Sequence, residues 1–296
     1  MDHCALLLLD AAAAVAAFLA VLCYVVAPGG VKVPIKGRHV FVTAGSSGIG
    51  LSLAKQATAE GDRVSILARN LRKLEEAHEE IRRATGVEAA IYSVEVRDEK
   101  AVREALEEAG TVDVLVCNHG VFLPRELVMV DMEEVRYTID INVVGTFNLI
   151  RHALPAMKQA AGGSPSRSIA VISSQADQIG VYGYTSYSAS KFALRGLAEA
   201  LQQESSITSA SPSSSPRTRA LDGIKSGKFL VTCNQVGSIL SLTTADEAPA
   251  NSVLAAFSEV VFAGVMRLIA LFILHGWYST IVKWNARQRR KAEKMT

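Results

Sequence analysis

Between Arg38 and Gln203 the chain alternates short apolar runs with longer segments of helical periodicity. The apolar runs are rich in β-branched residues, which is typical of strands buried on both faces of a sheet. We expect such strands at 38–43, 63–68, 88–94, 112–117 and 168–173. Helical patterns fill the intervals, at 51–61, from 71 to about 84, at 98–109, at 132–157 and at 187–203. This order predicts an α/β fold with a doubly wound parallel sheet, which binds ligands at the carboxyl ends of its strands.

The alternation stops at Ser205. Residues 205–216 read SSITSASPSSSP, a composition that predicts a flexible linker with neither a strand nor a packed helix. A helix end at 220–225 and a strand at 228–233 follow, and we expect this strand to enter the slot beside 168–173, because folding tends to cover an unpaired sheet edge. The predicted organisation starts with a membrane anchor at 1–30 and the α/β domain at 31–204. The linker at 205–219 and a remnant of the same domain at 220–250 follow, and a hydrophobic, membrane-associated helix with a basic tail occupies 251–296.

The first apolar run, Ala5–Ala27, carries Asp10 as its only charge and is long enough to cross a bilayer as a helix, at about 34 Å. No lysine or arginine precedes it and three follow it by position 38, so the positive-inside rule places the main body in the cytosol. A cleaved signal peptide lacks its basic leader here, and a buried alanine-rich helix would need a polar face. The mean hydropathy of +0.23 also favours a membrane segment.

A second apolar run at 253–274 is interrupted by Glu259 and Arg267 and is followed by an aromatic and basic tail. Such a tail suits a cytosolic membrane interface. A second span, a re-entrant hairpin and an interfacial helix all fit, and a plain solvated tail is the alternative.

Charge and cysteine content exclude several classes of protein. The net charge is only +2, so bulk charge does not hold a nucleic acid. The four cysteines form no C-x-x-C pair and the six histidines are isolated, which indicates neither a disulfide framework nor a metal site.

A glycine-rich turn joins the first expected strand to the first expected helix. Glycines let the backbone approach a pyrophosphate, and the helix N-terminus supplies unpaired N–H groups to it. The plainer alternative is a turn that only connects two elements. The candidate cofactor residues of this turn are Gly45, Ser46, Ser47, Gly48, Ile49 and Gly50.

About twenty residues further on, an NAD site places a carboxylate at the ribose hydroxyls, but here the second strand is followed by Arg69 and Asn70. An arginine pairs with a 2′-phosphate in bidentate geometry. We therefore expect NADPH rather than NADH, with Arg69 on the phosphate and Lys73 as an added charge, although a lysine at a helix start is commonly just solvated.

Tyr187 and Lys191 are spaced i and i+4, which puts them on one helix face. An ammonium beside a phenol lowers the phenol pKa toward the working pH, and it also reaches a ribose hydroxyl. Ser174, at the end of the 168–173 strand, is placed to hold a substrate carbonyl oxygen. Each feature alone has a plainer explanation, as a surface pair or a turn former, and the combination predicts a catalytic site.

Asparagine is a poor helix former, so Asn142 in an apolar helical stretch predicts a buried polar role, such as bending the helix and holding a water. Asn118 and Gly120 follow the 112–117 strand, and His119 between them is expected to be a loop residue rather than a catalyst.

Jointly these motifs resemble the short-chain dehydrogenase/reductase superfamily, over roughly 38–204. The resemblance implies a Rossmann-type domain with Tyr187 as proton donor, Lys191 as its pKa tuner and ribose ligand, Ser174 as carbonyl holder and Asn142 as a proton-relay residue. It also implies that Tyr187 and Lys191 contact the cofactor, together with the glycine turn, Arg69, Lys73, Glu95, Val96, Asn118 and Gly120.

Longer sequence segments resemble one particular family within this superfamily. The segment VISSQADQIGVYGYTSYSASKFALRGLAEALQQE, the leading apolar run and the tail LDGIKSGKFLVTCN are similar to plant members of the 3-ketodihydrosphingosine reductase family. That family implies NADPH-dependent reduction of a long-chain 3-keto sphingoid base at the cytosolic face of the endoplasmic reticulum membrane, without a nucleic acid partner. A homo-oligomer stays open. The alternatives are reduction of a steroid or retinoid ketone, and a non-catalytic, shortened relative.

The chain departs from the superfamily pattern at four places. Ala44 stands at a usual glycine of the turn, Glu95 at a usual aspartate and Asp177 at a usual glycine three residues after Ser174. The Ser-rich segment 205–216 replaces a strand and a Pro-Gly loop that seats the nicotinamide. This replacement predicts that the adenine and phosphate ends of NADPH bind while the nicotinamide is mobile and hydride transfer is impaired.

Overall fold

The computed structural model describes residues 10, 13–21, 33–159, 167–204, 208–213, 217–226 and 230–232, with scattered positions between 257 and 290. The chain divides into two compact units. One is Gly29–Ser238, and the other combines Met1–Pro28 with Ile239–Thr296.

The larger unit is built on a parallel sheet of seven strands, in the order β3-β2-β1-β4-β5-β6-β7. The strand order reverses between β1 and β4, and such a switch point is where open α/β sheets bind ligands. The prediction of a doubly wound parallel sheet is confirmed. The strands are β1 (His39–Thr43), β2 (Arg63–Ala68), β3 (Ala90–Ser93), β4 (Val114–Cys117), β5 (Ser168–Val171), β6 (Thr208–Ser213) and β7 (Leu230–Thr232).

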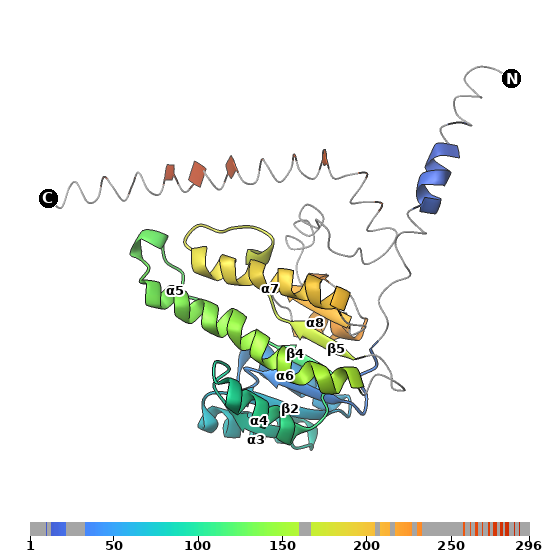
Figure 1. Cartoon of the computed structure of the whole chain (residues 1–296), viewed down its shortest axis with the longest axis vertical. Coiled ribbons are helices and arrows are strands. Elements are labelled where there is room, and N and C mark those ends of the chain that lie inside the picture. The colour runs from blue at the N-terminus through green and yellow to red at the C-terminus, as the bar shows by residue number, and fades with distance from the viewer. Residues whose placement is uncertain are drawn as a thin grey trace. The chain divides into compact units, whose positions relative to one another are not determined.

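Helices cover both faces of this sheet (Figure 1). One face carries α2 (Gly48–Ala59), α3 (Leu71–Thr85) and α8 (Arg217–Lys225), and the other carries α4 (Glu99–Ala109), α6 (Gly145–Gln159) and α7 (Thr185–Glu204). Short 3₁₀ turns lie at Leu127–Met129 and Gln175–Asp177.

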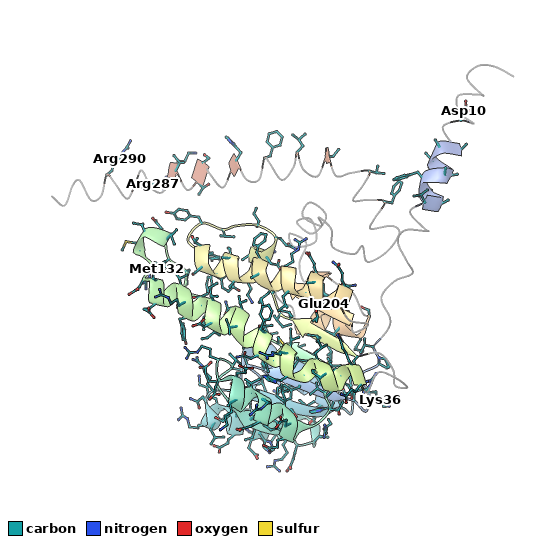
Figure 2. The ribbon with its side chains drawn as sticks, in the orientation of Figure 1. Asp10, Lys36, Met132, Glu204, Arg287 and Arg290 are labelled. Atoms are coloured by element: carbon teal, nitrogen blue, oxygen red, sulfur yellow. The ribbon has the colours of Figure 1, made fainter. Side chains whose placement is uncertain are left out.

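The long helix expected at 132–157 is present with one interruption. It starts as α5 (Met132–Ile139), passes through a π-helical turn at Asp140–Val144 and continues as α6. Figure 1 shows it as one green helix with α7 beside it, and Figure 2 labels Met132 at its start and Glu204 at the end of α7.

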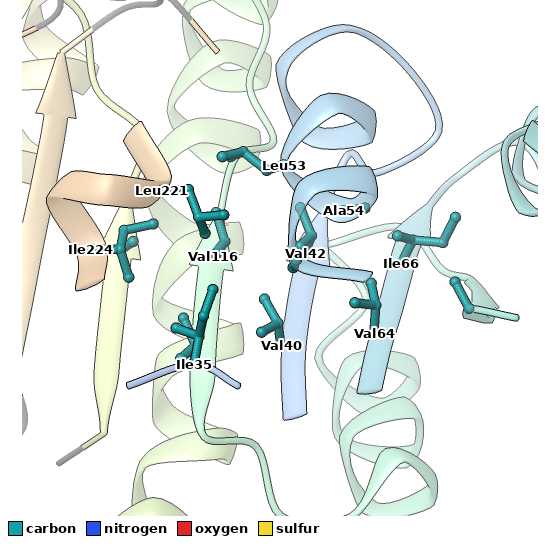
Figure 3. Packing of buried hydrophobic residues seen from close by; sticks show 14 of the residues in the cluster. Ile35, Val40, Val42, Leu53, Ala54, Val64, Ile66, Val116, Leu221 and Ile224 are labelled. Carbon is teal, nitrogen blue, oxygen red and sulfur yellow. The ribbon is translucent and has the colours of Figure 1, made fainter. Parts of the chain in front are cut away.

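Alternating residues of the strands supply the core on each face. Val40 and Val42 of β1 pack with Leu53 of α2 and Leu221 of α8 (Figure 3), whereas Phe41 between them packs on the opposite face. Burying a valine or leucine side chain fully contributes about 1.5–3 kcal/mol. These β-branched runs therefore both form the strands and hold the helices on them.

Residues 208–213 form β6, so the linker predicted for 205–216 is wrong over this stretch. β6 pairs in parallel with β5, from Ser168↔Thr208 to Ala170↔Ala210. Serine and threonine form this strand because a ladder needs only backbone N–H and C=O groups. Pro212, which has no N–H to donate, lies beyond the positions that pair with β5.

The strand expected at 228–233 is present as β7, but its predicted place beside β5 is wrong. β7 pairs with β6, from Ser211↔Leu230 to Ser213↔Thr232. The physical reason is that β6 follows α7 directly and closes a much shorter connection to the slot beside β5. The predicted boundaries at 204 and 219 thus fall inside the compact unit Gly29–Ser238.

In the smaller unit the described residues include a helix at 13–21. The ring centroid of Phe18 lies 6.3 Å from that of Phe257. Within the described positions, no helix combines the length and apolarity that crossing a membrane requires. Most of the runs at 5–27 and 253–274 lies outside the described residues.

Candidate active site

A cleft with a volume of about 300 Å³ lies at the carboxyl ends of β1, β2, β3 and β4. This is the edge that the fold class predicts for ligand binding. The predicted cofactor residues that line it are Ser46, Ser47, Arg69, Lys73, Glu95, Val96 and Gly120. Gly45 lies in the turn between β1 and α2, Gly48, Ile49 and Gly50 lie in the first turn of α2, and Asn118 directly follows β4.

The glycine turn has the backbone shape that its composition predicts. Gly48 has a φ of +58°, and a Cβ at Gly50 would collide with the Ala44 carbonyl oxygen and lie 2.7 Å from the Asn118 Nδ2. Ser47 is the N-cap residue of α2, but its side chain makes no capping hydrogen bond. The N–H groups of the first turn can therefore donate hydrogen bonds to a bound anion. Ala44 has a φ of +48°, a left-handed conformation that strains a non-glycine residue.

Thr43 ties the end of β1 to the end of β4, a role that the sequence analysis missed. Its Oγ1 accepts hydrogen bonds from the backbone N–H groups of Asn118, at 2.8 Å, and His119, at 3.1 Å. The His119 ring lies 2.9 Å from the same oxygen, and burial lowers its pKa to about 3. His119 is therefore neutral near pH 7, and it lies in the loop after β4, as predicted.

Arg69 lies at the rim of the cleft, just after β2. Its Nη1 donates to Glu95 Oε2 at 3.4 Å and to the Tyr137 hydroxyl at 3.0 Å. Glu95 Oε1 is buried and has no hydrogen-bond partner among the described residues. Lys73 lines the cleft from the first turn of α3, which Asn70 caps through its side chain.

The predicted catalytic residues Ser174, Tyr187 and Lys191 come together. Tyr187 and Lys191 lie one turn apart in α7, with Lys191 Nζ 5.6 Å from the Tyr187 ring centroid. Ser174 follows β5, caps the 3₁₀ turn at 175–177 and hydrogen-bonds to the Tyr187 side chain. The arrangement can hold a carbonyl oxygen and deliver a proton to it.

The expectation that Lys191 lowers the pKa of Tyr187 is wrong for this geometry. Burial raises the pKa of Tyr187, and the Asp177 carboxylate raises it further, while the hydrogen bond with Ser174 acts in the opposite direction. Lys191 Nζ instead donates to the Ile172 carbonyl oxygen at 3.0 Å, and burial lowers the pKa of Lys191 to about 8.

Asn142 is fully buried in the π-helical turn, as its position in an apolar helix predicts. Its Oδ1 accepts from the Val121 N–H at 2.8 Å, and its Nδ2 donates to Ser190 Oγ at 2.9 Å. A Cβ at Gly120 would lie 3.3 Å from Asn142 Oδ1 and 3.9 Å from Lys191 Nζ. Gly120 thus connects the cofactor cleft with the catalytic residues.

Asp177 adds a buried charge behind the catalytic residues. Its side chain is fully buried, neither carboxylate oxygen has a hydrogen-bond partner among the described residues, and burial raises its pKa to about 6. The side chains of Ser173, Gln178 and Ser188 also have buried polar atoms without such a partner. The sequence predicts a charge near the site but not its burial, which depends on packing against α7.

The residues present fit a dinucleotide. The turn after β1 leaves no room for a Cβ at Gly50, Arg69 offers positive charge, and Glu95 Oε1 is available to accept from an amino group such as that of adenine. Tyr137 is not predictable from the sequence, because its partner Arg69 lies 68 residues away and no local pattern links the two.

Comparison with known proteins gives one family for this architecture. Residues 38–209 match the family model for short chain dehydrogenases. A 3-dehydrosphinganine reductase from Arabidopsis thaliana is 45% identical over 313 residues, covering 94% of this chain and 94% of that protein. A 3-ketodihydrosphingosine reductase from Bos taurus is 32% identical and covers 97% of this chain and 98% of its own length.

Solved structures agree with the fold. An alcohol dehydrogenase from the archaeon Thermococcus sibiricus, complexed with 5-hydroxy-NADP, aligns with a TM-score of 0.55 and 25% identity. The alignment covers 60% of this chain and 75% of that one.

Proposed function

The chain belongs to the short-chain dehydrogenase family and is an oxidoreductase acting on a CH–OH or C=O group, and we propose that it reduces 3-dehydrosphinganine to sphinganine with NADPH. This substrate is a long-chain 3-keto sphingoid base. One observation carries the proposal: similarity to a 3-dehydrosphinganine reductase extends along 94% of both chains and includes the segment in which Ser174, Tyr187 and Lys191 meet.

The chain's own groups handle the carbonyl oxygen and the proton. The bound nicotinamide cofactor supplies the hydride. The Ser174 hydroxyl holds the carbonyl oxygen beside Tyr187, whose phenol donates the proton that this oxygen gains. The raised pKa of Tyr187 keeps the phenol protonated at rest, and the hydrogen bond with Ser174 favours the phenolate that forms. Asn142 holds the backbone at Val121 and the Ser190 hydroxyl beside this group.

NADPH is favoured over NADH by the geometry around Arg69. Two contacts use its Nη1, whereas the edge formed by Nε and Nη2 makes no contact with Glu95 or Tyr137. That edge matches a phosphate in bidentate geometry. No carboxylate directly follows β2, where an NAD site would present one to the ribose.

A membrane location at the cytosolic face of the endoplasmic reticulum suits this substrate, which partitions into lipid. The apolar runs at 5–27 and 253–274 and the basic tail support it. Protease added to sealed microsomes is then expected to digest the body and spare a short N-terminal fragment. Full protection of the body would contradict this orientation.

One observation favours a second candidate, a relative that binds the cofactor but turns over slowly or not at all. β6 is followed by Ser214, Ser215 and Pro216 instead of a Pro-Gly loop, so a nicotinamide-seating segment is replaced. A misplacement of about 1 Å costs about 100-fold in rate.

The test is NADPH oxidation, followed at 340 nm, by the full-length chain in detergent with a 3-keto sphingoid base. We expect turnover that depends on both substrates and that Tyr187→Phe abolishes. NADPH binding without turnover would support the second candidate, and reduction of a steroid or retinoid ketone in preference to the sphingoid base would refute the proposed substrate.

A further inference from the structure

Four side chains from three segments form a connected group at the rim of the cofactor cleft. Arg69 follows β2, Glu95 and Arg97 follow β3, and Tyr137 lies in α5. Arg69 Nη1 bonds to the Tyr137 hydroxyl at 3.0 Å and to Glu95 Oε2 at 3.4 Å. The Arg97 guanidinium lies 5.1 Å from the Tyr137 ring centroid, and its Nη2 lies 3.5 Å from Glu95 Oε2.

Tyr137 is the fixed member of this group. Its ring is half-buried and packs against the hydrophobic core on the α4, α6 and α7 face, so the position of its hydroxyl is set by the fold. The Arg69 side chain, in contrast, is 57% exposed. An exposed arginine samples many rotamers and loses this freedom when it binds a ligand.

The contacts with Glu95 and Tyr137 leave the Nε–Nη2 edge of the Arg69 guanidinium open. Arginine has five N–H donors, and both contacts in this group use Nη1. The edge formed by Nε and Nη2 is the one that binds a phosphate through two parallel hydrogen bonds. A hydroxyl is also a suitable anchor because, unlike Glu95, it does not compete with the phosphate as a second anion.

Resting on the proposed use of NADPH, we propose that Tyr137 is a positioning residue that selects for the 2′-phosphate by holding Arg69 through Nη1 with its Nε–Nη2 edge open. Tyr137 is absent from the lining of the cleft, so it acts through Arg69 and not by touching the cofactor. The phenol hydroxyl is the essential group, and the ring only supports it.

The experiment measures affinity for 2′,5′-ADP and for AMP by isothermal titration calorimetry, using the full-length chain in detergent. These probes differ by the 2′-phosphate alone and do not depend on how the nicotinamide is seated. Tyr137→Phe keeps the ring and removes the hydroxyl. We expect it to weaken 2′,5′-ADP binding by about 2- to 10-fold, the effect of one lost hydrogen bond, and to leave AMP binding unchanged.

A double-mutant cycle separates positioning from general damage. In an Arg69→Ala background, Tyr137→Phe is expected to have no further effect on 2′,5′-ADP binding, because the residue through which it acts is gone. Tyr92→Phe is the matched control, since Tyr92 is another half-buried tyrosine but lies outside the cleft lining and stacks on Phe41. It should alter neither affinity.

Equal weakening for both nucleotides, or additive effects of the two substitutions, would overturn the positioning role. A wild-type preference for 2′,5′-ADP that survives Tyr137→Phe unchanged would overturn this inference and leave the proposed use of NADPH intact. Equal affinity of the wild type for both probes would overturn both.

Discussion

The buried carboxylate of Asp177 makes the stability of the domain depend on pH in a direction that can be calculated. Burial raises its pKa from 3.8 to about 6, which is roughly 2 pKa units or about 3 kcal/mol. The shift is upward, so the unfolded chain ionises this group first as pH rises. Below about pH 4, ionisation of Asp177 therefore does not affect the free energy of unfolding. Once the pH exceeds about 6, its ionisation lowers that free energy by about 3 kcal/mol.

The perturbation that tests this is Asp177→Asn, which removes the charge and keeps the shape of the side chain. The buried amide has its own cost, but that cost does not change with pH. The difference in unfolding free energy between variant and wild type should therefore shift by about 3 kcal/mol in favour of the variant between pH 4 and pH 7. Asp62, whose pKa burial also raises to about 6, is present in both proteins and cancels in this difference.

The assay is urea unfolding of the full-length chain at pH 4, 5, 6 and 7, followed by far-ultraviolet circular dichroism. Tryptophan fluorescence is unsuitable because Trp277 and Trp284 belong to the smaller unit. Asp222→Asn, at an exposed position of α8, is the control for the loss of one carboxylate from the surface. A constant difference between Asp177→Asn and wild type from pH 4 to pH 7 would refute the reasoning.

Four further outcomes are expected. Tyr187→Phe should abolish turnover while NADPH binding persists, and retained activity would remove Tyr187 from the mechanism. Arg69→Ala should weaken NADPH binding by about 1.5–3 kcal/mol and NADH binding far less, and an equal loss in calorimetry would mean that the arginine only supports the fold. Ala44→Gly should raise the free energy of unfolding by up to about 1 kcal/mol, because relief of a left-handed conformation worth about 1–2 kcal/mol exceeds the added backbone entropy, and a loss of stability would contradict this. A version with a family-type strand and Pro-Gly loop in place of 205–216 should turn over much faster at similar NADPH affinity, and comparable rates would show that the segment does not limit hydride transfer.

The sheet could be predicted from the sequence because its central strands carry their own signal. Runs such as Val40–Val42 are apolar at every position, which is typical of strands that are buried on both faces of a sheet. The meeting of Tyr187 and Lys191 was predictable for a similar reason, since helical spacing alone brings them to one face.

What escaped prediction depends on contacts between distant segments. The pKa of Tyr187 rises because α7 and the loop after β5 bury it beside Asp177, and no spacing rule reports burial. The same holds for Tyr137, whose ring position is set by the core and whose hydroxyl meets Arg69 across the rim of the cleft. Sequence patterns predict the candidate reacting groups but not the residues that tune or position them.

β6 has a particular consequence for the catalytic residues. The contacts that fix them on the sheet run to β5 and the loop after it, through the Lys191 bond to the Ile172 carbonyl oxygen and the Ser174 bond to Tyr187. Neither of these two contacts involves β6, although α7 also packs against β6. The replacement of 205–216 therefore leaves the residues that make these contacts unchanged, and we expect a rate difference at similar NADPH affinity to report seating of the nicotinamide.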